Sequence, residues 1–307
     1  NAEVTWIWRK DGDSSNPVEG VEVKIGRKTK NIQIVKALIL ASGGFSRDVK
    51  MRQSFIPSIV PEFNCTNQPG ATGEMIRYAQ AVGADTLQLA FIQLYPYAEP
   101  ETGILDSPAV YPFRGPGYGI VYVNKLGKRF VNEMERRDVV SMAQIKTGMK
   151  PTYSIFNEAM IPKMGTKEEV EKGMAKGRFI KAETLSELAT KLGIPADAVE
   201  ETIKNHNGFM ADGKDPDFGR QFTKSMIPLT EGPFYAIAQW PAVHHTMGGL
   251  RINKDAQVID IWGKPIPRLY AAGEVTGGIH GSNRLGGNAI PGCIVFGRMA
   301  GRNAGKK

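Results

Sequence analysis

The chain has 307 residues, 41% of them hydrophobic, which is enough to bury a sizeable core and predicts two domains. Its formal net charge is +8, but the 39 basic residues are spread among 31 acidic ones and no nucleic-acid-binding motif occurs, so we expect small anions rather than nucleic acid as partners. No apolar run approaches the roughly 20 residues that span a bilayer, and we expect no transmembrane segment.

The N-terminal part of the chain has the pattern of β-strands. Apolar or alternating stretches at residues 3–8, 21–25 and 32–39 surround turn signals such as Asp11-Gly12-Asp13, which predicts a small β-meander. Residues 36–41 then form a buried strand that ends at Ser42-Gly43-Gly44. We expect this to be a parallel strand whose carboxyl end reaches a ligand.

Helices dominate the middle of the chain. The apolar residues within 73–83 have helical spacing. A second unit begins near Phe91 and interrupts the first domain, to which the chain returns at about His244. Within this second unit, helices are predicted at residues 138–147, 167–172, 184–192 and 195–212.

The C-terminal part combines a buried strand, an acid and several glycines. Glu274 follows the strand at 269–272, at the end of a doubly wound sheet where ligands collect, so its carboxylate could accept hydrogen bonds from a ribose. Nearby glycines remove the Cβ atoms that would keep a flat ligand away from the main chain: Gly273, Gly277 and Gly278. An ordinary glycine-rich turn explains the glycines alone equally well.

A helix is predicted from about Ala289 to Asn303. It opens after Gly286-Gly287-Asn288, so its unpaired N–H groups can face negative charge on a ligand, and Pro291 in its first turn costs no intrahelical bond. Arg284 lies just before these glycines, and this combination favours a ligand site over a simple strand-to-helix turn.

Histidines and cysteines give weaker signals. His244 and His245 precede Thr-Met-Gly-Gly and, taken alone, fit either part of a metal site or ordinary packing. Cys65 and Cys293 are too few for a disulfide framework and lack metal-ligand spacing, so we expect two buried thiols and no metal site.

Several ordered motifs together resemble one family. Residues 244–249 (His-His-Thr-Met-Gly-Gly), 272–278 (Ala-Gly-Glu-Val-Thr-Gly-Gly), 283–288 (Asn-Arg-Leu-Gly-Gly-Asn) and 127–133 (Gly-Lys-Arg-Phe-Val-Asn-Glu) are similar to the soluble fumarate reductase and flavocytochrome c flavoproteins, relatives of the succinate dehydrogenase flavoprotein subunit. Further matches lie at residues 41–45, 66–67 and 69–73. The resemblance extends from about Ala37 to the end of the chain.

The resemblance implies an α/β fold with a partial doubly wound FAD-binding domain and an inserted α+β capping domain. We place the FAD-binding portions at residues 1–91 and 244–307 and the capping domain at 92–243. The first βαβ unit of such a domain needs Gly-x-Gly-x-x-Gly to hold the pyrophosphate, and that sequence does not occur here. We therefore expect an N-terminal FAD-binding segment to be missing, either as a separate chain or by loss, and FAD to bind weakly or not at all without it.

The implied activity is FAD-dependent reduction of the C=C bond of an α,β-unsaturated carboxylate of the fumarate, urocanate or acrylate type. Flavin N5 supplies a hydride to one alkene carbon, and Arg137 matches the residue that supplies a proton to the other. His244 and Arg284 match the pair that clamps the carboxylate, where negative charge grows in the transition state. Without the resemblance, residues 135–138 would be a solvated charged turn, and Arg136 is an alternative register for the acid.

The resemblance also implies a set of cofactor and substrate contacts. The backbone N–H of Gly287 matches a contact to the substrate. The cofactor positions are Gly43, Gly44, Glu74, His245, Glu274, Ala289 and Ile290.

The substrate pocket departs from the family pattern. Fumarate reductases hold a second carboxylate with Gln-x-His-Pro and a Thr-Glu pair, but this chain has Tyr95 and Pro112-Phe113 at those positions. Tyr95, Phe113 and Tyr118 predict an aromatic wall suited to a ring-bearing or apolar acrylate, although ordinary core packing also explains them. Arg114 nearby could still serve a dicarboxylate.

Two other functions stay open, namely a flavin-dependent dehydrogenase of the succinate or ketosteroid type and a non-catalytic flavoprotein fragment. A reductase implies an electron donor, either a haem protein, a flavin or a quinone-linked partner, and no Cys-x-x-Cys-His haem motif is present in the chain. The resemblance favours a periplasmic location, with the cytoplasm as the alternative.

Overall fold

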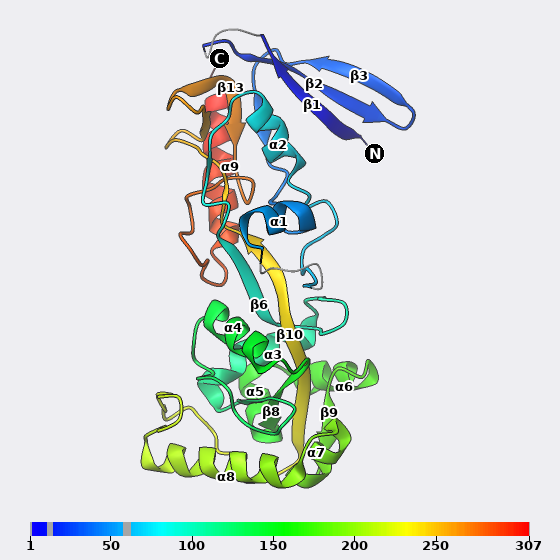
Figure 1. Cartoon of the computed structure of the whole chain (residues 1–307), viewed down its shortest axis with the longest axis vertical. Helices are drawn as coiled ribbons and strands as arrows, with labels where there is room; N and C mark the ends of the chain where they lie inside the picture. Colours follow the sequence, from blue (N-terminus) through cyan, green and yellow to red (C-terminus); the bar gives the residue numbers. More distant parts are fainter. Residues whose placement is uncertain (1, 11–14, 58–62, 307) are drawn as a thin grey trace. The chain divides into compact units, whose positions relative to one another are not determined.

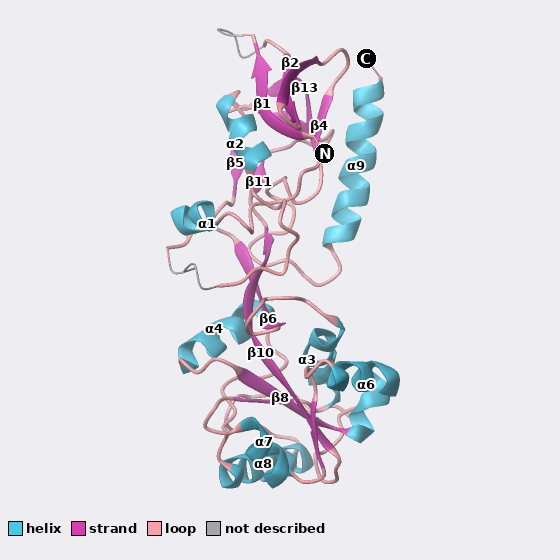
Figure 2. Cartoon of the chain, turned by 90° about the vertical axis from the view of Figure 1, so that its right-hand side faces the viewer, coloured by secondary structure: helices cyan, strands magenta, loops and turns pink. Residues whose placement is uncertain are grey.

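The computed structural model describes residues 2–10, 15–57 and 63–306, and the chain forms two compact units (Figures 1 and 2). Unit 1 combines residues 1–62, 67–93 and 243–307, and unit 2 combines residues 63–66 and 94–242. We predicted breaks after Phe91 and Val243, whereas the compact units change after Gln93 and Ala242.

Unit 1 begins with an antiparallel sheet in the order β1-β2-β3, formed by Glu3–Arg9, Val18–Ile25 and Lys28–Gln33 (Figure 1). The predicted meander is confirmed, but the third strand was predicted too late, at residues 32–39. A tight turn at Gly26 (φ +60°) pairs Ile25 with Lys28 and so fixes the register of β3. The apolar residues that follow β3 are therefore not part of the hairpin.

The second sheet of unit 1 has the order β12-β13-β4, formed by Gln257–Ile259, Pro265–Ala271 and Leu38–Leu40. β4 runs parallel to β13, which confirms the parallel strand predicted at residues 36–41. Because parallel strands end on the same side, the turn after β4 and the turn after β13 come together, and Gly44 meets Glu274 there.

Three helices and one short ladder complete the described part of unit 1: α1 (Val49–Phe55), α2 (Glu74–Ala81), α9 (Ala289–Gly305), and β5 (Thr86–Leu87) paired with β11 (Gly249–Leu250). The helices predicted within 73–83 and from Ala289 are confirmed. α9 contacts β13 and β4 (Figure 2), and only its C-terminal half packs into a core, around Ala300.

The two cysteines differ in exposure. Cys65 is buried, as predicted, but Cys293 is exposed, so the prediction of a second buried thiol is wrong. The reason is that Cys293 lies in the N-terminal half of α9, which the described residues of unit 1 leave largely uncovered.

Unit 2 is built on an antiparallel sheet in the order β6-β10-β8-β7, with β9 also paired to β10. The strands are β6 (Ile92–Ala98), β7 (Val121–Val123), β8 (Thr152–Asn157), β9 (Ile180–Ala182) and β10 (Phe234–Thr246). All six residues of β8 are buried, as expected for a strand covered on both faces.

Helices pack around this sheet: α3 (Val110–Arg114), α4 (Arg137–Thr147), α5 (Ile161–Met164), α6 (Lys167–Ala175), α7 (Leu185–Leu192) and α8 (Ala196–Asp212). The four predicted helices of this unit are confirmed, with α6 longer than expected. Thr166 and Glu169 form a capping box at the start of α6. Glycines in the left-handed conformation end α4, α7 and α8, namely Gly148, Gly193 and Gly213. No helix in the described ranges is long and apolar enough to cross a membrane.

A buried ion cluster ties together the loop that leads into α4. Glu133 accepts an ion pair from Arg129 (2.8 Å) and another from Arg220 (3.0 Å), and Arg129 also pairs with Asp215 (2.8 Å). These side chains are at most 4% exposed. The cluster fixes the matched motif 127–133 and so the approach to Arg137.

Candidate functional site

Arg284 is held firmly within unit 1. Its side chain is only 6% exposed, and its Nη2 donates to Oε1 of Gln93 (3.1 Å). Gln93 in turn donates through Nε2 to the carbonyl of Arg284 (2.6 Å) and to Oδ1 of Asn283 (2.5 Å). The predictions did not include Gln93 as a site residue, although its place at the start of Gln-Leu-Tyr-Pro was a signal for it.

His244 is half-buried on the same unit, and its backbone is anchored by Asn67. The Nδ2 of Asn67 donates to the His244 carbonyl (3.0 Å) and to Oγ of Ser46 (2.7 Å). Asn67 therefore links the turn after β4 to the end of β10. Its amide is a second positioning residue that the sequence predictions left out.

His245 and Glu274 form a hydrogen-bonded pair. The His245 Nδ1 lies 3.2 Å from Oε2 of Glu274, whose Oε1 accepts from the backbone N–H of Thr246 (2.9 Å) and its hydroxyl (3.1 Å). Burial alone would raise the pKa of the Glu274 carboxyl, but the donors on His245 and Thr246 hold that pKa below its ordinary value. Glu274 is thus a carboxylate that fixes the turn 244–246.

The pairing also fixes which nitrogen of His245 faces the rest of the site. Because Nδ1 faces the carboxylate, Nε2 points away from it, and Nε2 is buried without a hydrogen-bond partner among the described residues. A cavity of about 60 Å³ lies here, lined by His245, Glu274, His280, Ala289 and Cys293 among others. Burial, together with the neighbouring His245, lowers the pKa of His280.

The glycines near the ends of β4 and β13 are of two kinds. At Gly44, close contacts leave no room for a side chain, whereas at Gly43 and Gly287 the space beside the backbone is empty of described atoms. A Cβ at Gly44 would lie 2.0 Å from Oγ1 of Thr246 and 2.6 Å from Oε1 of Glu274, so only glycine fits. A Cβ at Gly43 (φ +82°) or Gly287 (φ +86°) would meet no atom within 4 Å among the described residues beyond its chain neighbours. Their backbones are accessible from outside.

The remaining predicted cofactor positions are at helix starts. Glu74 is the first residue of α2, and Ala289 and Ile290 begin α9. Ile290 is 68% exposed. The side chains of Glu74 and Ala289 are half-buried, so none of the three is fully buried within the described part of unit 1.

Arg137, on unit 2, is the first residue of α4 and lies against two aromatic rings. Its guanidinium carbon is 4.9 Å from the ring centroid of Tyr95 and 4.8 Å from that of Phe113. Its Nη1 is buried and has no hydrogen-bond partner among the described residues, and burial lowers the pKa of Arg137. Arg136 is instead exposed and pairs with Asp138 (2.8 Å), so Asp138 orients Arg136.

The three aromatic residues predicted to line the substrate pocket differ in how deeply they are buried in unit 2. Tyr95 is buried and donates its hydroxyl hydrogen to the Ala109 carbonyl (3.1 Å), whereas Phe113 is 44% exposed. Tyr118 is half-buried against the core of the unit. Arg114 donates to the Met164 carbonyl (2.8 Å).

Comparisons with known proteins place the chain in a family. The model of the FAD binding domain family matches residues 1–290. The chain belongs to this FAD-binding family. It is 40% identical over 294 residues to an NADH:fumarate oxidoreductase of Klebsiella pneumoniae (strain 342), covering 96% of this chain and 31% of the relative. It is 39% identical over 273 residues to a urocanate reductase of Eggerthella lenta, covering 88% of this chain and 44% of the relative.

The fold matches a solved member of the same flavoprotein group. The open conformation of a flavocytochrome c3 fumarate reductase superimposes with a TM-score of 0.79 and 35% identity, over 99% of this chain and 52% of that one. The chain thus spans about a third to a half of the length of these relatives.

The residues of unit 1 fit the FAD of this family. A buried imidazole nitrogen without a partner, a carboxylate held ionised and glycines with open backbones are the groups that a flavin nucleotide can use for hydrogen bonds and close approach. The described residues contain no group of three or more His, Cys, Asp or Glu arranged to hold a metal ion.

Proposed function

We propose that this chain carries the substrate site of an FAD-dependent reductase that reduces the C=C bond of an α,β-unsaturated carboxylate. The observation that carries the proposal is the guanidinium of Arg137, which is desolvated, in contact with two rings and provided with a buried Nη1 that has no partner among the described residues. The relatives' names, fumarate oxidoreductase and urocanate reductase, support the same reaction class.

In this proposal the protein residues bind the carboxylate and deliver one proton. Bound FAD supplies the hydride. His244 and Arg284 hold the substrate carboxylate, where negative charge develops, and fixed cationic donors stabilise that charge more in the transition state than in the ground state. Arg284 suits this role because Gln93 already fixes its direction. Arg137 donates the proton to the carbon next to the carboxylate.

We propose a substrate with one carboxylate and a ring or apolar group at the other end. The resemblance to fumarate reductases implies that Tyr95 and Phe113 occupy the positions where those enzymes hold the second carboxylate. Arg114, which could have replaced those partners, donates instead to the Met164 carbonyl. Tyr118 and the backbone of Gly287 are the further substrate contacts of this proposal. The electrons come from a haem protein, a flavin or a quinone-linked partner, and the name flavocytochrome of the solved relative supports a haem donor.

A substrate screen tests this function. The FAD-loaded full-length enzyme, which includes the Gly-rich βαβ segment proposed below, is given fumarate, urocanate, cinnamate and methacrylate with a reduced viologen as electron donor. We expect turnover with at least one of the three monocarboxylates, faster than with fumarate. Faster reduction of fumarate would contradict the proposed pocket, and no reduction of any enoate would contradict the proposed reaction.

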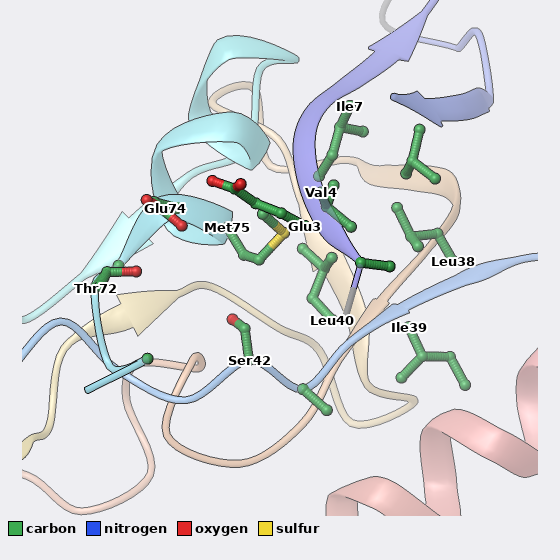
Figure 3. A pocket seen from close by; sticks show the side chains of 15 residues that line it. Glu3, Val4, Ile7, Leu38, Ile39, Leu40, Ser42, Thr72, Glu74 and Met75 are labelled. Atoms are coloured by element: carbon green, nitrogen blue, oxygen red, sulfur yellow. The ribbon is translucent and has the colours of Figure 1, made fainter. Parts of the chain in front are cut away.

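We further propose that a Gly-rich βαβ segment, from the same polypeptide or another, pairs with the open edge of β4. β4 is the last strand in the order β12-β13-β4, and Ile39 on it is 39% exposed. A cavity of about 430 Å³ lies between β4, the start of β1 and the first turn of α2, where Leu40, Val4 and Met75 contribute side chains (Figure 3). This edge of β4 is unpaired among the described strands, and such an edge beside a largely apolar cavity suits a further parallel strand.

Flavin titration checks this second proposal. We expect the chain alone to bind FAD weakly, because the backbone N–H groups that hold the pyrophosphate come from the Gly-rich turn. Adding a βαβ segment from a relative, fused before Asn1, should give tight binding, measured by flavin absorbance and fluorescence quenching. Tight binding by the unextended chain would contradict it. A fusion that carries Pro in place of Ile39 is the control, since it should lose strand pairing.

A further inference from the structure

The guanidinium of the half-buried Arg137 has different surroundings from those of the buried Arg129 side chain in unit 2. Arg129 also lies over a ring, 5.0 Å from the centroid of Phe218, but it is paired with Glu133 and Asp215. Arg137 forms no ion pair with the described residues, and its guanidinium carbon lies 4.9 Å from the ring centroid of Tyr95 and 4.8 Å from that of Phe113. The guanidinium of Arg137 therefore packs against aromatic rings, whereas that of Arg129 is paired with carboxylates.

The two rings are themselves held rigidly. The Tyr95 hydroxyl donates to the Ala109 carbonyl (3.1 Å), and the Tyr122 hydroxyl donates to the Pro112 carbonyl (2.7 Å), so both phenols anchor the segment that carries Phe113. The ring of Tyr97 packs against both rings, with its centroid 5.3 Å from that of Tyr95 and 6.5 Å from that of Phe113. The cluster is a preformed aromatic seat for the guanidinium.

We propose that Tyr95 and Phe113 are positioning residues that hold Arg137 as the proton donor through cation–π contacts, in place of a carboxylate. This inference rests on the proposed function. It assigns the two rings to the arginine rather than to the substrate alone. A guanidinium stacked on aromatic faces keeps its N–H groups available at its edge, whereas a carboxylate would occupy them.

The chemistry of proton donation favours such a seat. When the N–H proton moves to the substrate carbon, its bonding pair stays on the nitrogen and a neutral guanidine remains, which regains a proton from water between turnovers. Beside a carboxylate, that neutral state would leave a buried charge without its partner, which is strongly unfavourable. Beside aromatic rings, only the modest cation–π attraction is lost. Burial among rings also lowers the pKa of Arg137, which makes it a stronger acid.

Ring-removing and ring-retaining variants test the inference in the FAD-loaded protein. Phe113→Leu should lower kcat about tenfold with little change in KM, because it removes one cation–π contact while keeping an apolar side chain of similar size. Phe113→Tyr keeps the ring and should restore kcat. Phe218→Leu is the matched control, since it removes the ring beside the ion-paired Arg129 and should leave kcat unchanged.

A spectroscopic measurement that needs no turnover separates this inference from the proposed function. The side-chain N–H resonance of Arg137, identified by its loss in Arg137→Lys, should move in Phe113→Leu and stay in place in Phe218→Leu. An unmoved resonance in Phe113→Leu, or an effect confined to KM, would overturn the inference while the reductase function stands. A wild-type protein that binds FAD but reduces no enoate would overturn the proposed function and, with it, the role of Arg137 as donor.

Discussion

In the complete protein, Arg137→Ala is expected to abolish reduction of the enoate C=C bond and to leave FAD binding unchanged. A positioned general acid contributes about 10²–10⁴-fold to a rate, and no other donor replaces it in this proposal. The side chain lies in unit 2, whereas the residues proposed to contact FAD lie in unit 1, so the cofactor should still load. Turnover measured with reduced viologen, together with the flavin absorbance of the purified variant, checks both parts.

The neighbouring arginine provides a matched control for this prediction. Arg136 has the same side chain and almost the same place in sequence, but it is 63% exposed and pairs with Asp138. Arg136→Ala should therefore keep nearly full turnover. If Arg136→Ala were inactive and Arg137→Ala active, the acid would be assigned one position too late, and turnover in both variants would remove arginine from the proton-donor role.

Local patterns were enough to predict much of the fold. The helix Ala196–Asp212 and the parallel strand Leu38–Leu40 follow from apolar spacing and from the turn residues that bound them. The third strand was misplaced because Ile32, Ile34 and Val35 look like a strand, whereas the turn at Gly26 had already fixed the hairpin register. Pairing across a turn decided the outcome there.

The site was less predictable because its contacts join distant parts of the chain. Nothing in the sequence places the Tyr95 and Phe113 rings on Arg137, since these residues belong to β6, α3 and α4. Glu274 was expected to bind a ribose from its place after a strand. Its interaction with His245 and Thr246 depends on the meeting of β10 with the turn after β13, which no local pattern encodes.

Glu133→Gln should lower the free energy of unfolding of unit 2 by about 3–5 kcal/mol, the cost of breaking a buried ion pair by removing one partner. Glu133 is fully buried between Arg129 and Arg220, and its loss leaves Arg129 paired only with Asp215 and Arg220 with no ion pair among the described residues. The buried His206 adds no further positive charge at neutral pH, because burial and Arg220 lower its pKa to about 4. Urea unfolding followed by hydrogen exchange of β8 reports on this unit alone.

The pH dependence of that difference distinguishes an ionic effect from a packing effect. Burial opposes ionisation of Glu133, but Arg220 and Arg129 outweigh it and hold the carboxyl pKa below its ordinary value. A depressed pKa in the folded state means that the stabilisation is present above the unfolded pKa, about 4.3, and is lost as the pH falls through the folded pKa. The difference in unfolding free energy between wild type and Glu133→Gln should therefore be full at pH 7 and shrink in acid.

Glu168→Gln is the control for this prediction. It breaks only the exposed pair with Lys172 and should cost less than about 0.5 kcal/mol at any pH. A gap that stays constant down to acid pH would show that Glu133 acts through its shape and not its charge.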